Sequence, residues 1–157
     1  MDFTIVIDTR EQQPYSFACA MIHRKLEAGD YSIAGCESQI AVERKSLPDF
    51  VNTVIHDMDR FGVELEALAR FELACVVVEA DLDTVLRGLR QLDLRMVTPS
   101  AVLGSALHVA VRHRVPVYWC GSRQAACAFT EGFLRMAVRE GAVSLPRESP
   151  GVEAARG

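Results

Sequence analysis

Three carboxylates and one lysine stand at spacings that would bring them into one small space. Glu43 and Lys45 are two residues apart, and residues two apart in a strand project to the same face. Asp30 follows Gly29 at a turn, and Asp8 ends an opening β-branched run. If the strands that carry these two aspartates are neighbours of the strand that carries Glu43, all three carboxylates meet.

Carboxylates this close repel one another unless a divalent cation neutralises them, and hard oxygen ligands suit Mg²⁺ or Mn²⁺. Such an ion lowers the pKa of bound water and polarises a phosphoryl oxygen, while a nearby ammonium stabilises developing negative charge. The spacing therefore predicts hydrolysis of a phosphodiester. A Glu-Arg-Lys triplet alone is expected by chance in roughly 3% of chains of this length, so the combination of residues carries the prediction.

Each of these residues, taken alone, has a more frequent explanation. The triplet at residues 43–45 would be a solvated strand end, and Asp30 would be a turn residue after glycine. Tyr15 and Phe17 would either stack on a nucleobase or pin their own loop to the domain, and pinning is the more frequent role of loop aromatics.

The elements that would position these residues follow from hydrophobic periodicity and turn residues. Short β-branched or apolar runs predict strands over residues 3–8, 21–26, 31–34, 39–44, 73–79 and 115–120. Helical spacing of apolar residues predicts helices that begin near residues 46, 58, 81, 99 and 122, the third of them over 81–92. On the second helix, Phe61 and Leu65 face the core while Glu64, Glu66 and Arg70 face water.

Strands and helices alternate in the second half of the chain, after an early hairpin. This order predicts the α/β class, with a mixed central β-sheet flanked by helices on both faces. Residues 1–140 are expected to form this one domain, because 157 residues suffice for one compact core. Residues 141–157 carry prolines and glycines without periodicity, so they are expected to form a flexible C-terminal tail.

Composition narrows the classes of partner. The chain is half hydrophobic with a formal net charge of −4, so it folds but has no global attraction to polyanions. A nucleic-acid role would depend on local basic residues, or on acidic residues that hold a metal ion. The five cysteines include no Cys-x-x-Cys pair, so zinc and disulfides are not expected. The absence of a long apolar run or a signal peptide predicts a cytoplasmic protein without membrane partners.

Three segments carry a recognisable pattern: Ile-Asp-Thr-Arg-Glu-Gln at residues 7–12, Gly-Asp-Tyr at 29–31 and Glu-Arg-Lys-Ser-Leu-Pro-Asp at 43–49. Together they resemble the nuclease signature of the XPF-type structure-specific endonucleases, which is written GD, a variable gap and ERKxxxD. This family belongs to the PD-(D/E)XK nuclease superfamily, so the resemblance implies a restriction-endonuclease-like fold. Residues 14–17 are similar to bacterial and phage members that carry this domain alone.

The resemblance implies a role for each residue that matches the signature. Asp8, Asp30 and Glu43 would be the acidic metal-site positions, and the Arg44 carbonyl oxygen would be a further ligand. Lys45 would be the catalytic lysine, which orients the attacking water or stabilises the transition state. A role for this lysine as a base would additionally require a depressed pKa.

Further residues match positions around the signature. Asp49 and Glu11 would lie outside the metal ligands and orient the catalytic lysine, a neighbouring arginine or metal-bound water. Arg10 would be either an ion-pair partner or a phosphate contact, as would the Arg44 side chain. Arg60 resembles the basic position that the family has after the first helical turns.

Together these observations predict a metal-dependent DNA endonuclease that uses Mg²⁺ or Mn²⁺, and the resemblance implies a preference for branched or flapped DNA. The alternative is a non-catalytic DNA-binding or scaffolding subunit, since the family includes partners that kept the fold and lost the site. DNA repair, recombination and the processing of phage or plasmid DNA all stay open as pathways.

The resemblance also implies a partner protein, either a second copy of this chain or another subunit of the family. Relatives pair through the late strand and helices. The apolar stripe at Ala126, Phe129, Phe133 and Met136 would serve that interface, although core packing explains the same stripe.

Overall fold

The structure is a computed structural model that describes residues 2–88 and 97–146. Within these residues, six strands form one sheet in the order β2-β1-β3-β4-β5-β6. Their bounds are Thr4–Ile7 (β1), Ala20–His23 (β2), Tyr31–Ile33 (β3), Ile40–Lys45 (β4), Leu73–Val78 (β5) and Val117–Trp119 (β6). β3 is antiparallel to β1 and β4, and the other pairs are parallel. The mixed sheet predicted from the sequence is confirmed.

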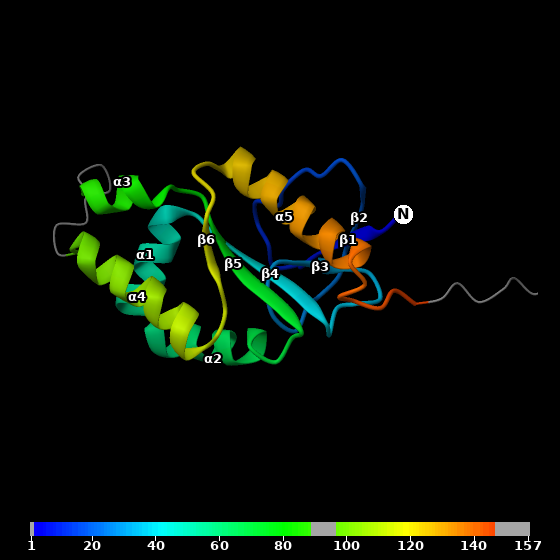
Figure 1. Cartoon of the computed structure of the whole chain (residues 1–157), viewed down its shortest axis with the longest axis horizontal. Helices are drawn as coiled ribbons and strands as arrows, with labels where there is room; N and C mark the ends of the chain where they lie inside the picture. Colours follow the sequence, from blue (N-terminus) through cyan, green and yellow to red (C-terminus); the bar gives the residue numbers. More distant parts are fainter. Residues whose placement is uncertain (1, 89–96, 147–157) are drawn as a thin grey trace, which may run out of the picture.

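Helices cover both faces of this sheet, as the sequence also predicted. They are Leu47–His56 (α1), Met58–Leu68 (α2), Leu82–Arg87 (α3), Pro99–Arg112 (α4) and Arg123–Arg139 (α5). Figure 1 shows α5 on one side of the sheet, with α1, α2 and α4 on the other. Each face therefore has its own apolar core, and the described helices include none long and apolar enough to cross a membrane.

The start of α1 has the capping chemistry that its sequence predicts. Ser46 is the N-cap, and its hydroxyl accepts a hydrogen bond from the Asp49 N–H at 3.2 Å. Pro48 lies in the first turn, where no intrahelical N–H is needed. Because α1 begins two residues after Lys45, this cap fixes the direction in which the chain leaves β4.

Several elements are shorter than the sequence predicts. The strand predicted over 115–120 is reduced to β6, which begins after Pro116, a residue without an N–H to donate to the ladder. The strand predicted over 21–26 is β2, which ends at His23 opposite the end of β1. The helix predicted over 81–92 ends at Arg87, before Gly88 with a φ of 116°, and its remainder from residue 89 lies outside the described residues.

Residues 141–146, which the sequence assigned to the tail, pack against the β3–β4 hairpin. Val143 is buried, and the Ser144 N–H donates to the Gln39 side-chain oxygen at 2.9 Å. A Cβ on Gly35 would lie 2.3 Å from Cγ of Pro146, so the two segments are in close contact. The packed part of the chain therefore extends at least to residue 146, and the rest of the expected tail lies outside the described residues.

Candidate active site

The pairing register of three neighbouring strands brings the predicted carboxylates side by side. Tyr31 on β3 lies opposite Ile7 on β1 and opposite Val42 on β4. The next position along each strand brings Asp8, Asp30 and Glu43 side by side as cross-strand neighbours. The Asp8 N–H donates to the Asp30 carbonyl at 2.8 Å. Tyr31 and Val42 point into the α5 layer, so the three acidic residues belong to the opposite face, which α1 and α2 cover.

Asp30 and Glu43 share a cavity of about 390 Å³ at this end of the sheet. The Arg44 backbone N–H donates to Asp30 Oδ2 at 2.8 Å and fixes that carboxylate. Burial raises the pKa of Asp30 to about 7, and burial together with the Asp30 charge raises the pKa of Glu43 well above its usual range. Since the charged forms of both neighbours are disfavoured, a cation between them would be stabilising.

Lys45 lies on the same face as Glu43, in agreement with their spacing. Its Nζ is 3.0 Å from Glu43 Oε1 and 5.1 Å from the ring centroid of Phe61 on α2. Burial acts to lower the pKa of Lys45, but the Glu43 carboxylate outweighs it and raises the pKa above its ordinary value. A raised pKa favours the ammonium form of Lys45, which fits charge stabilisation and water orientation better than the role of a base.

The Asp8 carboxylate is bonded to Arg10 and does not line this cavity. Arg10 Nε donates to Asp8 Oδ2 at 2.8 Å, and Arg10 Nη2 lies 2.5 Å from the same oxygen. Burial acts to raise the pKa of Asp8, but the hydrogen bonds from Arg10 lower it overall. Of the three carboxylates predicted to converge, two share the cavity, and Asp8 stands beside them with an arginine as its partner.

The donor set of this cavity fits a hard divalent cation such as Mg²⁺, which proteins often bind through one or two carboxylates plus waters and substrate phosphates. Asp30 and Glu43 supply such a pair. The N–H and C=O of one strand residue point to the same edge, so the Arg44 carbonyl oxygen also faces Asp30. Across residues 2–88 and 97–146, no three His, Cys, Asp or Glu side chains are arranged to hold a metal ion by themselves.

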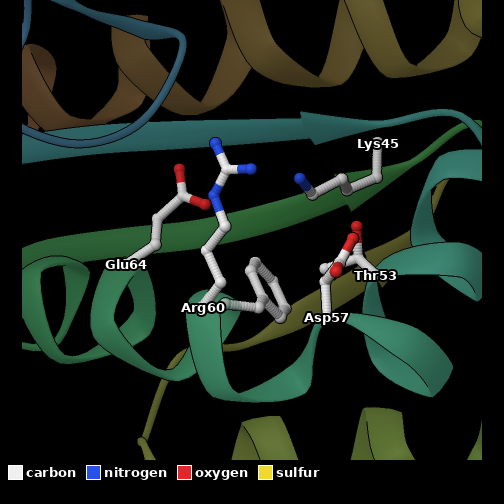
Figure 2. Close-up of a pocket in the computed structure, with 6 residues that line it drawn as sticks. Lys45, Thr53, Asp57, Arg60 and Glu64 are labelled. Atoms are coloured by element: carbon white, nitrogen blue, oxygen red, sulfur yellow. The ribbon is translucent and has the colours of Figure 1, made fainter.

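A second cavity, of about 220 Å³, adjoins the first and shares Lys45 with it. Figure 2 shows Lys45 reaching toward it from β4, with Arg60 and Glu64 side by side on α2. The nearby Glu64 carboxylate adds to the burial and the Asp30 charge that raise the pKa of Glu43. The sequence placed Glu64 toward water, although its spacing of four residues from Arg60 indicated a shared helix face.

The Arg44 side chain points to the α5 face, away from the carboxylate pair. Its Nε donates to Glu79 Oε1 at 2.7 Å, and its Nη1 lies 3.5 Å from Glu11 Oε1. Of the two roles predicted for this side chain, the ion pair fits its position. Sequence reasoning missed Glu79, although this residue directly follows the buried strand β5 that pairs with β4.

Two further predicted residues, Glu11 and Asp49, line the 390 Å³ cavity. The Asp49 carboxylate accepts a hydrogen bond from the Ser46 hydroxyl at 2.6 Å, at the start of α1. The Glu11 carboxylate accepts from the Gln13 N–H at 2.7 Å within its own loop. Both acidic residues line the cavity; the bond of Asp49 is local, whereas Glu11 also accepts from Arg44 Nη1 at 3.5 Å.

The loop aromatics pin their loop rather than stand free. Tyr15 and Phe17 are 3% and 7% exposed, and the Tyr15 ring stacks on Tyr31 with 5.1 Å between centroids. The Tyr31 hydroxyl accepts a hydrogen bond from the Tyr15 N–H at 3.0 Å. Stacking on a nucleobase, the other role considered for these rings, is therefore not available to them in this arrangement.

Comparison with known proteins supports this view of the fold. The ERCC4 domain family matches residues 7–133. A structure of XPF from Aeropyrum pernix is similar with a TM-score of 0.69 and 18% identity over 96% of this chain and 69% of that one. A second, described as XPF from Aeropyrum pernix in complex with DNA, has a TM-score of 0.67 and 18% identity over 88% of this chain and 66% of that one. None of the curated proteins matches.

The family match and the structural likeness agree with the signature residues. The mixed sheet with helices on both faces is that of the XPF nuclease domain, so the predicted restriction-endonuclease-like fold is confirmed. The chain spans about two thirds of the length of the similar XPF chains. The family supports a nuclease-type function on DNA. Because the match extends over most of the sequence, this chain belongs to the ERCC4 domain family.

Proposed function

We propose that this protein is a metal-dependent DNA endonuclease that hydrolyses phosphodiester bonds. The observation that carries the proposal is the carboxylate pair, Asp30 and Glu43, on neighbouring strands beside a cavity. The Lys45 ammonium lies 3.0 Å from Glu43 at the border of the same cavity. Two carboxylates and one ammonium at a solvent-accessible strand end suit the hydrolysis of a phosphodiester. This reaction needs side chains that bind the metal ion and a donor that stabilises the charge on the phosphate oxygens.

Each side chain has a part in the proposed reaction. Bound Mg²⁺ or Mn²⁺ would supply Lewis-acid chemistry at the scissile phosphate and a more acidic water. Asp30, Glu43 and the Arg44 carbonyl oxygen would hold the ion, with Asp8 as a further ligand if it leaves Arg10. Lys45 donates to the phosphate oxygens or to the attacking water and stabilises the negative charge that develops there.

The substrate is proposed to be DNA, and branched or flapped DNA in particular. A relative of this fold is described as a complex with DNA, and the branched preference comes from the XPF-type resemblance. Arg60 is exposed on α2 and lines the cavity that Lys45 borders, which supports its proposed role as a contact to a phosphate of the bound strand. Arg10, whose side chain is 61% exposed, borders the site on the other side.

A homodimer, or a pair with another family subunit, is part of the proposal. Tyr118 on the edge strand β6 is 38% exposed, and its ring centroid lies 4.7 Å from that of Phe129 on α5. Phe133 stacks on Phe129, and Met136 is half exposed one turn further. This row of side chains, beside a strand that is the edge of the sheet among the described residues, is the surface expected to meet a partner.

The test is cleavage of labelled flap, fork and linear duplex DNA with Mg²⁺, Mn²⁺ or chelator. The expected result is metal-dependent cutting that falls about 100-fold or more in both Asp30→Asn and Lys45→Ala, the usual scale for removing charge stabilisation. Asp83→Asn and Lys25→Ala, which alter exposed residues elsewhere, are the matched controls and should cut normally. Binding of DNA without cutting would favour a scaffolding subunit, and cutting by both site variants would place the active site elsewhere.

A further inference from the structure

We propose that Glu79, with the Tyr15 hydroxyl, is a positioning residue of the active site: it holds the Arg44 side chain on the α5 face so that Asp30, Glu43 and Lys45 stay aligned on the opposite face. The Glu79 side chain reaches the groups assigned to the reaction only through Arg44, while the Glu79 backbone N–H donates to the Lys45 carbonyl at 3.0 Å. This inference rests on the proposed nuclease function, and it adds residues that the nuclease signature does not contain.

The first step is the set of bonds on the Glu79 carboxylate, whose side chain is 9% exposed. Oε1 accepts from Arg44 Nε at 2.7 Å, from the Tyr15 hydroxyl at 2.8 Å and from Arg123 Nη1 at 3.2 Å. Oε2 accepts from Arg44 Nη2 at 3.2 Å, which makes the Arg44 pair bidentate. One buried carboxylate thus joins three segments that are far apart in the sequence.

The second step runs from the Arg44 side chain to the site. Arg44 lies between Glu43 and Lys45 on β4, so its side chain and theirs leave the same strand end in opposite directions. Its backbone N–H donates to Asp30 Oδ2 at 2.8 Å. A shift of the Arg44 backbone would therefore move all three groups that the proposed reaction uses.

The third step concerns the loop that carries Gln13 and Pro14. Arg123 Nη2 donates to the Gln13 carbonyl at 2.7 Å and to the Pro14 carbonyl at 3.1 Å, and its guanidinium lies over the Tyr15 ring. Gln13 lines the cavity that Asp30 and Glu43 share. The carboxylate that anchors Arg44 thus also holds, through Tyr15 and Arg123, the loop whose Gln13 lines the cavity.

The experiment compares Glu79→Gln and Tyr15→Phe with Val138→Ala. The first two remove hydrogen bonds of the network with little change of shape, and the third trims a buried side chain of α5 that makes none of these bonds. Thermal midpoints are measured first, and activity is measured well below all of them. For each protein, kcat and KM are determined on flap DNA with Mg²⁺, and exchange of the Arg44 amide hydrogen is followed by NMR without metal or DNA.

If Glu79 positions the site, Glu79→Gln lowers kcat about ten-fold with KM within about two-fold, because misplacement of reacting groups acts on the chemical step. Tyr15→Phe acts in the same direction and more weakly, and Arg44 amide exchange accelerates about ten-fold in Glu79→Gln. Val138→Ala leaves kcat and the Arg44 amide exchange rate unchanged within about two-fold, although its thermal midpoint falls as much as that of Glu79→Gln or more.

The inference is overturned if Glu79→Gln loses no more activity than Val138→Ala, or if the loss appears in KM alone. The amide exchange separates this outcome from a failure of the proposed function. Should the wild-type protein cut no DNA, unchanged Arg44 exchange in Glu79→Gln would still refute positioning, whereas accelerated exchange would support it without reference to activity.

Discussion

At the residue scale, Arg10 competes for the one predicted metal ligand that stays outside the shared cavity. Asp8 is next to Asp30 in register, but its carboxylate accepts from Arg10 Nε at 2.8 Å. Arg10→Ala frees this carboxylate, so the variant is expected to bind Mn²⁺ about five-fold more tightly, since a hard cation gains a charged oxygen ligand. Calorimetric titration with Mn²⁺ measures the affinity, and Lys25→Ala is the control. Unchanged affinity in Arg10→Ala would show that Asp8 takes no part in the site.

Glu79 makes the stability of the fold depend on pH. Burial acts to raise the pKa of Glu79, but hydrogen bonds from Arg44 and Tyr15 lower it overall. A lowered folded pKa means that the stabilisation is complete above the unfolded value of about 4.3 and is lost as the pH falls through the folded value. Glu79→Gln should lower the free energy of unfolding by about 2 kcal/mol at neutral pH, with a difference that shrinks in acid. Urea denaturation of both proteins, at neutral pH and at a pH below the unfolded pKa of glutamate, measures this difference in the free energy of unfolding. A difference that is the same at both pH values would contradict a lowered pKa of Glu79.

Which residues share a face could be predicted from the sequence, because alternation along one strand is a local property. It placed Glu43 and Lys45 together and Arg44 opposite, as the structure does. The hydrogen-bond partners could not be predicted. Glu64 acts on Glu43 because α2 covers this face of the sheet, and the partner of Glu79 depends on which strands are neighbours.

At the element scale, the segment at residues 141–146 packs against the hairpin between β3 and β4, and Gly35 leaves room for this contact. Gly35 has a φ of 84°, and a Cβ there would lie 2.3 Å from Pro146 Cγ. Gly35→Ala is therefore expected to lower the free energy of unfolding by about 1–2 kcal/mol. Gly104→Ala on α4, where nothing lies within 4 Å of the new Cβ, should raise it by about 0.5–1 kcal/mol. Denaturation of the two variants checks this contrast, and equal effects would contradict it.

The existence of most elements could be predicted from periodicity and caps, and their ends could not. Ser46 followed by Pro48 predicted the start of α1, because helix capping depends only on residues within one helical turn. The packing of Val143 and Ser144 against the hairpin is a contact over more than a hundred residues of sequence, and no local signal encodes it. The glycine and proline content of this segment is equally compatible with a segment that packs on the domain and with a free tail.

At the scale of the whole molecule, the aromatic row on β6 and α5 predicts self-association. Met136→Glu places a charge on the half-exposed end of this row, so it is expected to convert a dimer into a monomer. Leu107→Glu on α4, at a residue that is 54% exposed away from the row, is the control and should remain dimeric. Light scattering after size-exclusion chromatography measures the mass, and a monomeric wild-type protein would contradict the proposed pairing.

The central claim is that the carboxylates facing each other across β3 and β4 support metal-dependent hydrolysis of DNA. Single-turnover cleavage of a flap substrate by the wild-type protein and by Glu43→Gln, over a titration of Mg²⁺, tests it most directly. The wild-type rate should be undetectable without Mg²⁺, rise as Mg²⁺ is added and reach a plateau. The rate of Glu43→Gln should be at least about 100-fold below the wild-type rate at every Mg²⁺ concentration. A wild-type rate that ignores Mg²⁺, or an undiminished rate in Glu43→Gln, would contradict the claim.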